Sequence, residues 1–155
     1  SEVLNDSLPH AMDKGIDLGY DGVDSEKKRK FLKLQGNPTL LKEMIRNLVD
    51  NAIHYTPSTP ERMGIITVRL LVDPYSQALA VQVEDNGPGI PAAERERVFE
   101  PFYRALGSNV DGSGLGLPIV REIAQRHGAS VTVEVAHPGQ ALPGACFTIR
   151  FAPAD

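Results

Sequence analysis

Two glycine-rich segments and a pair of asparagines carry the side chains and main-chain groups of this sequence that are best suited to bind a ligand. The first segment reads Asp85-Asn86-Gly87-Pro88-Gly89-Ile90, and the second reads Gly112-Ser113-Gly114-Leu115-Gly116-Leu117. Asn47 and Asn51 lie upstream of both. A carboxylate can accept a hydrogen bond from a base, glycine-loop N–H groups suit phosphate, and amide oxygens suit Mg²⁺. Together and in this order, they predict a site for a nucleoside triphosphate and its metal.

The first glycine segment follows a strand predicted over Leu79–Glu84. Asp85 at the strand end could accept a hydrogen bond from an amine such as N6 of adenine. Gly87 and Gly89 would let the main chain turn tightly and approach a flat base. A tight turn capped by the aspartate side chain explains the same residues, and both interpretations stay open at this point.

The second glycine segment leads into a helix predicted over Pro118–Arg126. A glycine loop at a helix N-terminus presents free N–H groups to an anion. The segment lacks the Gly-Lys-Ser/Thr ending of a Walker A loop and the βαβ setting of a Rossmann fingerprint, so a flexible hinge is the alternative. Arg104 precedes this loop, and a guanidinium suits phosphate oxygens.

The asparagines belong to a helix predicted from Asn37-Pro38 to about Tyr55, with asparagine as N-cap. Asn47 and Asn51 are four residues apart, so they share a face that His54 continues. This polar line borders the apolar stripe, where a pocket wall would lie. A polar helix flank is the plain alternative, although asparagine is a mediocre helix former. The apolar stripe consists of Leu41, Met44, Ile45, Leu48, Val49 and Ala52.

The remaining elements must position these residues. A short helix is predicted over Pro91–Val98, a mobile loop over 105–113, and a hairpin connection at Asp73–Ser76; Gly128 closes the helix over Pro118–Arg126. Together with Leu79–Glu84, the predicted strands are Gly15–Gly22, Phe31–Leu34, Ile65–Val72, Val131–Val135 and Phe147–Phe151. The tally predicts an α/β two-layer sandwich, in which about three helices cover one face of a sheet of about five strands.

Bulk properties exclude several classes of protein. The net charge of −4 argues against broad binding of nucleic acid or anionic membrane. No apolar run reaches the roughly 20 residues that span a bilayer. Cys146 is the single cysteine, so no disulfide framework is expected and a reducing compartment is favoured. Because the chain begins at Ser1, we expect it to be a piece of a longer protein.

Four segments in family order resemble the boxes of bacterial sensor histidine kinases. The segment Asn47-Leu48-Val49-Asp50-Asn51-Ala52 resembles the N box, and Asp85-Asn86-Gly87-Pro88-Gly89 resembles the G1 box. The segment Phe99-Glu100-Pro101-Phe102-Tyr103-Arg104 resembles the F box, and residues 112–117 resemble the G2 box. Over roughly residues 15–153, the chain is similar to the catalytic and ATP-binding domain (HATPase_c) of a two-component kinase. That resemblance implies the Bergerat fold of the GHKL superfamily, with a mixed, mostly antiparallel sheet.

The resemblance also implies roles for individual residues. Asp85 would bind the adenine amine, Asn51 with help from Asn47 would hold Mg²⁺, and Arg104 would meet the phosphates. Residues 90–113 would form a lid over ATP, residues 15–155 the catalytic domain, and residues 1–14 the end of a connecting segment. The implied nucleotide-binding set is Asn51, His54, Tyr55, Asp85, Gly87, Gly89, Ile90, Arg104, Gly112, Gly114, Leu115, Gly116 and Leu117.

Partners follow from the same resemblance. The γ-phosphoryl group of ATP would pass to a histidine on a dimerisation and histidine-phosphotransfer domain of the parent protein, and a response regulator would act downstream. None of His10, His54, His127 and His137 lies in the His-Glu-x-x-x-Pro context of a phosphoacceptor. The chain would then be a cytoplasmic domain, monomeric in isolation, of an inner-membrane sensor. His54 also departs from the family, since many members have Lys or Arg there.

Two other functions share this fold. Water-activating GHKL ATPases carry a glutamate base where this chain has Asn47, and an amide cannot take a proton from water at neutral pH. Anti-sigma serine kinases resemble that glutamate pattern as well. A degenerate module that docks partners without turnover is the third possibility, and intact glycine segments with both asparagines argue against it.

Overall fold

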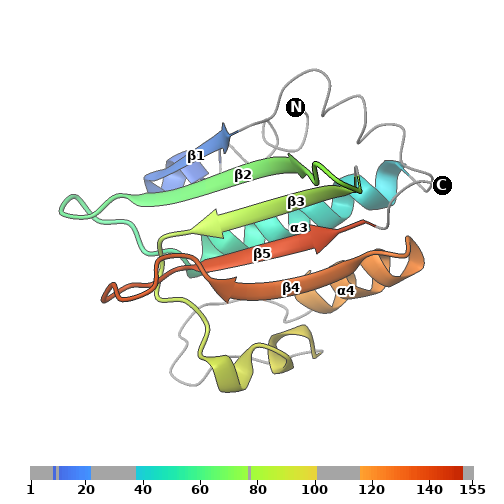
Figure 1. Cartoon of the computed structure of the whole chain (residues 1–155). Coiled ribbons are helices and arrows are strands. Elements are labelled where there is room, and N and C mark those ends of the chain that lie inside the picture. Colours follow the sequence, from blue (N-terminus) through green and yellow to red (C-terminus); the bar gives the residue numbers. More distant parts are fainter. Residues whose placement is uncertain (1–8, 10, 22–37, 77, 101–115, 152–155) are drawn as a thin grey trace.

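The structure is a computed structural model that describes residues 9, 11–21, 38–76, 78–100 and 116–151 (Figure 1). Along the chain, the elements run β1, α3, β2, β3, two 3₁₀ turns, α4, β4 and β5. The strand predicted over Phe31–Leu34 and the loop predicted over 105–113 lie outside the described residues. The same holds for Asn37, Arg104, Gly112, Gly114 and Leu115.

Five strands form one sheet in the order β1-β2-β3-β5-β4. Their bounds are β1 Ile16–Asp21, β2 Gly64–Val72, β3 Leu79–Asp85, β4 Ser130–Val135 and β5 Ala145–Arg150. Strand β1 runs parallel to β2, and every other neighbouring pair is antiparallel. The mixed, mostly antiparallel sheet is therefore confirmed.

The predicted hairpin connection joins β2 to β3. The main-chain N–H groups of Tyr75 and Ser76 donate to Oδ1 of Asp73 at 2.8 and 2.9 Å, and Asp73 N–H donates to Ala78 O at 2.9 Å. The hydrogen bonds from Ser76 and Tyr75 lower the pKa of the exposed Asp73 carboxyl. An aspartate side chain thus closes this turn, as aspartate commonly does.

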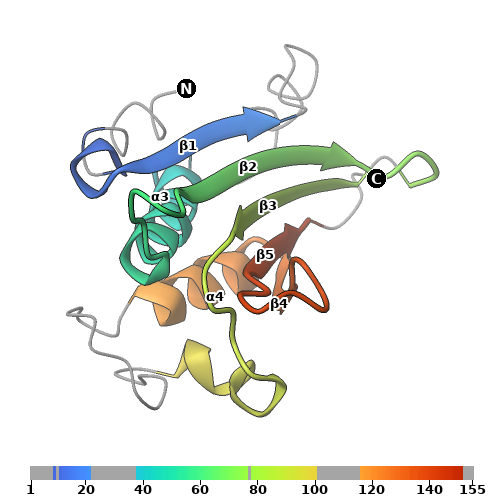
Figure 2. The same cartoon turned by 90° about the vertical axis from the view of Figure 1, so that its left-hand side faces the viewer.

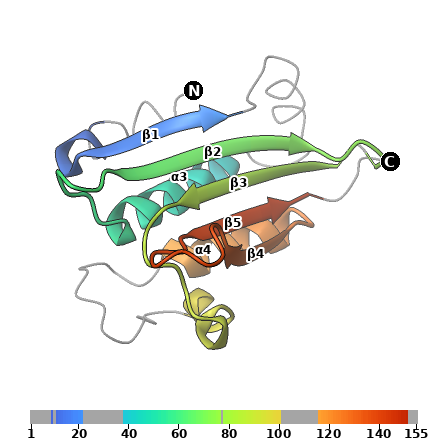
Figure 3. The same cartoon turned by 60° about the vertical axis from the view of Figure 1, so that its left-hand side comes forward.

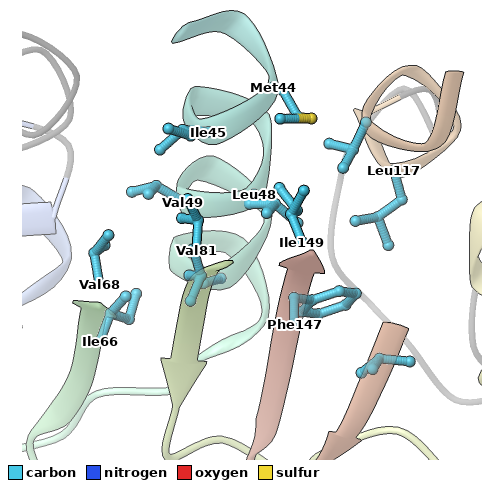
Figure 4. Packing of buried hydrophobic residues seen from close by; sticks show 14 of the residues in the cluster. Met44, Ile45, Leu48, Val49, Ile66, Val68, Val81, Leu117, Phe147 and Ile149 are labelled. Atoms are coloured by element: carbon cyan, nitrogen blue, oxygen red, sulfur yellow. The ribbon is translucent and has the colours of Figure 1, made fainter. Parts of the chain in front are cut away.

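Helices α3 (Pro38–Tyr55) and α4 (Gly116–Arg126) cover one face of the sheet, as Figure 2 shows. The predicted apolar stripe of α3 faces the sheet, and all six of its residues are buried. Leu48 and Val49 lie over Val81 and Ile149 of the sheet, with Phe147 close by (Figure 4). The core therefore lies between the helices and one face of the sheet, which confirms the two-layer sandwich.

The opposite face of the sheet carries polar pairs between neighbouring strands. Gln82 on β3 donates to the Thr148 hydroxyl on β5 at 3.3 Å. Arg69 on β2 pairs with Glu84 on β3 at 3.2 Å. Along β3, buried residues alternate with half-buried ones. This period of two is what a sheet with one covered face requires.

Helix α4 starts two residues before the predicted start at Pro118. The helix begins at Gly116, so the proline occupies its third position. A proline is tolerated in the first turn because N–H groups there have no partner within the helix. At the other end, Gly128 has φ +66°, its N–H donates to Gln125 O, and Ala129 N–H donates to Ala124 O. This pair of bonds is a Schellman motif, and it confirms the predicted end.

The single short helix predicted over Pro91–Val98 is wrong. The segment instead forms two separate 3₁₀ turns, Ala92–Glu94 and Arg97–Phe99. The first of them contains no buried residue, whereas Val98 and Phe99 are buried in the second. Because apolar residues face the core only at one end of the segment, packing does not favour a continuous helix.

Candidate functional site

Asp85 ends β3 and is buried, with 8% of its surface exposed. Its Oδ1 accepts the main-chain N–H of Gly87 at 2.9 Å and that of Ala145 at 3.3 Å. Burial raises the pKa of the carboxyl, and the two main-chain hydrogen bonds offset part of the rise. Since both of these bonds use Oδ1, the arrangement leaves Oδ2 to accept a hydrogen bond from a ligand donor.

The main chain around Asp85 is held by the segment that leads into β5. Gly144 N–H donates to Gly87 O at 2.8 Å. Gly144 has φ +71°, and a Cβ there would overlap the main-chain oxygen of Asp85. Only glycine allows so close an approach. Gly144 and Ala145 are not among the predicted site residues, although the Pro143-Gly144 pair is a turn signal that could have pointed to them.

The end of α3 meets the same turn. A Cβ on Gly87 would lie 3.1 Å from Tyr55 O and 3.2 Å from Asp85 Oδ1. The C-terminal ends of α3 and β3 and the β4–β5 connection consequently meet at one end of the sheet (Figure 3). The structure thus brings Asp85 and Gly87 next to Tyr55, which sequence analysis had placed in the same candidate pocket.

The polar side chains predicted to line one face of α3 differ in their exposure to solvent. Asn47, Asn51 and Tyr55 are half-buried, and His54 is exposed. The amide nitrogen of Asn47 donates to Glu43 O at 2.9 Å and to Glu43 Oε1 at 3.4 Å. These bonds occupy the nitrogen of the amide, so its oxygen is the atom suited to a cation. The line therefore sits at the border between core and solvent, as its spacing predicts.

Asn86 has a structural role that sequence analysis did not identify. Its Oδ1 accepts Ile65 N–H at 2.8 Å, its Nδ2 donates to Met63 O at 3.0 Å, and its own N–H donates to Ile65 O at 3.2 Å. These three bonds pin the start of the turn to the start of β2. Asparagine side chains often replace main-chain partners in this way at turns.

Phe99, the first residue of the aromatic segment, packs into the core, whereas Glu100 is exposed. The Phe99 ring meets the Phe147 ring edge to face, with centroids 6.2 Å apart. The Arg121 guanidinium on α4 lies 5.6 Å from the centre of the Phe99 ring and 3.8 Å from the Glu96 carboxylate. These contacts tie Phe99 in the second 3₁₀ turn, and Glu96 just before that turn, to α4.

Four further predicted site residues lie within the described part of the chain. Ile90 and Gly89 follow the Asp85 turn and are half-buried, and Gly89 has φ +78°. Leu117 is buried in the first turn of α4, where Gly116 is the first residue. Because α4 packs alongside α3, its N-terminus belongs to the same helical layer as the asparagines. Within the described part of the chain, no group of three or more His, Cys, Asp or Glu side chains could hold a metal ion.

These features define a class before any relative is considered. A buried carboxylate at a strand end, a glycine turn beside it and a polar flank of an adjacent helix, on a mixed sheet with one covered face, match the expectations for a Bergerat-type ATP-binding domain. The family model described as "Histidine kinase-, DNA gyrase B-, and HSP90-like ATPase" (HATPase_c) matches residues 36–155, and the chain belongs to this family. ATP is the nucleotide of the family.

Curated relatives of the chain are named sensor kinases. This chain is 34% identical over 142 residues to the sensor protein kinase PmrB of Pseudomonas aeruginosa, and the match covers 91% of this chain and 27% of PmrB. It is 37% identical over 150 residues to the histidine-protein kinase/phosphatase MprB of Mycobacterium avium, covering 96% of this chain and 27% of the relative. The chain therefore spans about a quarter of the length of these relatives. Their names support the histidine kinase interpretation over the ATPase and serine kinase alternatives.

Solved structures show the same architecture. The mycobacterial sensor histidine kinase MprB has a TM-score of 0.79 at 30% identity, covering 97% of this chain and 93% of the solved one. The catalytic domain of the histidine kinase ThkA has a TM-score of 0.74 at 26% identity, covering 99% and 91%. Among the described residues, no helix has both the length and the apolar character needed to span a membrane.

Proposed function

We propose that this domain binds ATP with Mg²⁺ and donates the γ-phosphoryl group to a histidine on another domain of the same parent protein. The observation that carries the proposal is the Asp85 carboxylate. It is buried at a strand end, its Oδ1 is held by two main-chain N–H groups, and its Oδ2 is left to accept from the adenine amine. An ionised carboxylate only accepts hydrogen bonds. Asp85 held in this way therefore favours a base with an amine donor at that position, such as adenine, over a base with an acceptor there.

The neutral amides of α3 suit the metal. Asn51 is half-buried one helical turn after Asn47, whose amide nitrogen is bonded within the helix and whose oxygen is the atom left for a cation. Mg²⁺ prefers oxygen ligands and takes its remaining ligands from water and substrate phosphates, so two amide oxygens fit without a cluster of carboxylates. In the proposed site, Asn51 with help from Asn47 would hold the ion, which would neutralise phosphate charge when bound.

In phosphoryl transfer, the residues of the proposed site would position the nucleotide and its phosphates. The transferred group needs little covalent chemistry from the protein, so alignment and charge neutralisation dominate. Tyr55 would lie against the nucleotide and His54 would reach toward a phosphate, both from the last turn of α3. Arg104 and the N–H groups of Gly112, Gly114 and Gly116 would meet the phosphates.

The acceptor and the downstream partner are part of the same proposal. The histidine would belong to a dimerisation and phosphotransfer domain, and a response regulator would then take the phosphoryl group. A relative supports the second step, because a structure of the histidine kinase ThkA contains the response regulator protein TrrA (TM-score 0.71, 25% identity). The domain would be cytoplasmic and monomeric in isolation, within an inner-membrane sensor.

Incubation with γ-labelled ATP tests the proposal. This chain by itself is expected to bind ATP but to label itself negligibly and hydrolyse ATP very slowly, because an amide stands where a glutamate base would activate water. Adding a separate fragment with the parent's phosphoacceptor helix should place label on a histidine of that fragment. Rapid stoichiometric labelling of this chain alone, or fast hydrolysis without a partner, would contradict the proposal.

A further inference from the structure

Lys14 joins the segment that enters the domain to the end of the nucleotide-site helix. Its Nζ donates to Ile53 O at 2.6 Å and to His54 O at 2.8 Å. Residues 11–14 are helical and precede β1, and Ala11 is fully buried in the core. Lys14 therefore binds two carbonyls in the last turn of α3, although it lies 39 residues before Ile53 and 40 residues before His54 in the sequence.

A second contact joins the same two segments. The Ser58 hydroxyl donates to Gly15 O at 2.6 Å and accepts Gly64 N–H at 2.9 Å. Gly15 has φ +74°, and its N–H donates to Met12 O at 3.0 Å. The chain thus turns sharply just after Lys14, and the turn is fixed to the loop that leaves α3.

The last turn of a helix is where such contacts matter most. Its final four carbonyls have no partner inside the helix, and the helix dipole makes that end negative. Lysine near a helix C-terminus satisfies both the hydrogen bonds and the charge. Partial burial lowers the pKa of the Lys14 ammonium, so the group has given up hydration to make these contacts.

The carbonyls that Lys14 binds belong to residues beside the candidate site. His54 and Tyr55 follow Ile53 directly, and Asn51 lies one half-turn before it on α3. Tyr55 O also lies against Gly87 of the adenine turn. A change at Lys14 would therefore reach groups on both sides of the proposed nucleotide site through the last turn of one helix.

We propose that Lys14 is a positioning residue that latches the incoming segment onto the last turn of α3, so that nucleotide affinity and the conformation of that segment are coupled. The inference rests on the proposed function, because it concerns the same nucleotide site. The latch consists of the Lys14 contacts with Ile53 O and His54 O. By reciprocity, whatever releases the latch weakens ATP binding, and ATP binding tightens the latch by the same factor.

Two variants of Lys14 test the proposal by calorimetric titration of the folded chain with ATP and Mg²⁺. Lys14→Met keeps the aliphatic stem and removes the donors, so the Kd for ATP should rise about five- to tenfold. Lys14→Arg can donate to both carbonyls and should restore most of the affinity. Lys42→Met is the matched control, since Lys42 is an exposed lysine on α3 itself, and it should leave the Kd unchanged.

Hydrogen exchange measures the other direction of the coupling. In the natural sequence, ATP should slow amide exchange across residues 11–16, including the Gly15 N–H bonded to Met12 O. In Lys14→Met this effect of ATP should disappear, whereas protection near Asp85 by ATP should persist. A purely structural lysine would lower the melting temperature and leave the Kd of the folded protein unchanged.

The two proposals fail in different ways. If the natural sequence does not bind ATP, the proposed function is wrong. If it binds ATP and Lys14→Met binds equally well, or if ATP leaves exchange across residues 11–16 unaltered, the latch is wrong and the nucleotide site stands. Equal losses of ATP affinity in Lys14→Met and Lys14→Arg would also overturn the latch, because the arginine retains the hydrogen-bond donors and the positive charge.

Discussion

Replacing Asp85 with asparagine changes the proposed adenine site at a single group. The asparagine Oδ1 can still accept the N–H groups of Gly87 and Ala145, which lie 2.9 and 3.3 Å from the aspartate Oδ1. These two donors fix which way the amide points, so its NH₂ takes the place of Oδ2. The asparagine NH₂ then faces the adenine amine. Both groups are donors, so no hydrogen bond forms between them.

The size of the effect follows from the burial of the group. Asp85 is 8% exposed, so a lost ligand bond is not replaced by bulk water. A hydrogen bond to a charged group contributes about 1.5–3 kcal/mol, and a buried donor without a partner costs about 1–3 kcal/mol more. Asp85→Asn should therefore lose about 3 kcal/mol or more of ATP binding, which corresponds to roughly 100-fold or more in Kd.

Without ATP, the stability of the fold should not fall in Asp85→Asn, in contrast to the affinity for ATP. Because burial raises the pKa of Asp85 in the folded state, its ionised form costs stability above the pKa of the unfolded chain. Lowering the pH through the raised pKa protonates the carboxyl and removes that cost. At neutral pH, Asp85→Asn should accordingly be at least as stable to urea as the natural sequence, and its advantage should shrink in acid.

Asp73→Asn is the matched control. Asp73 also accepts two main-chain N–H groups through Oδ1, but it is exposed in the β2–β3 hairpin, and its pKa is lowered. Its stabilising effect is present above the unfolded pKa and is lost as pH falls through the folded pKa, so the variant should lose stability at neutral pH. ATP affinity should not change. Titration calorimetry measures the Kd for ATP of each variant, and urea unfolding measures its stability. A folded Asp85→Asn variant that binds ATP within about threefold of the natural sequence would show that Asp85 does not bind the adenine amine.

Three further changes test other parts of the site. Asn51→Ala should weaken ATP binding chiefly when Mg²⁺ is present, since its proposed role is to hold the metal; equal losses with and without Mg²⁺ in equilibrium titrations would contradict that role. Gly144→Ala should lower the free energy of unfolding in urea by more than about 1–3 kcal/mol, because φ is +71° and a Cβ would overlap main chain, whereas Gly139→Ala at φ +86° in open space should show only the backbone cost. Arg121→Met should lower the free energy of unfolding by about 0.5–1 kcal/mol, because it removes both the cation 5.6 Å from the centre of the Phe99 ring and the exposed ion pair with Glu96; an unchanged unfolding midpoint would show that neither contact stabilises the fold.

Local patterns in the sequence predicted most of the elements. The apolar spacing of α3 identified the face that is buried, and Pro38 marked its first residue. Gly128 marked the end of α4 because few residues other than glycine adopt its φ of +66°. The aspartate at the end of β3 followed from alternation in the strand before it. Each of these signals depends on residues within one or two turns of the chain, so no knowledge of the fold is needed.

Two helix predictions differ from the structure, and both concern segments that begin at a proline. The sequence predicts that α4 begins at Pro118, but first-turn N–H groups have no helical partner, so a proline at the third position fits equally well. At Pro91 we predicted one short helix, and the structure has two 3₁₀ turns. Phe99 and Arg121 explain the difference, because the second turn is held by a contact with α4 rather than by its own continuation.

Sequence patterns are enough to identify the chemical groups available for nucleotide binding, their order along the chain, and the faces of the helix and strands that carry them. How those groups are held is visible only in the folded chain, where Asp85 accepts a hydrogen bond from Ala145, 60 residues away, and Lys14 donates one to Ile53, 39 residues away. The raised pKa of Asp85 likewise depends on burial by segments far along the chain. Periodicity and turn signals act over a few residues, whereas these contacts arise only when the strand order β1-β2-β3-β5-β4 brings distant segments to one end of the sheet.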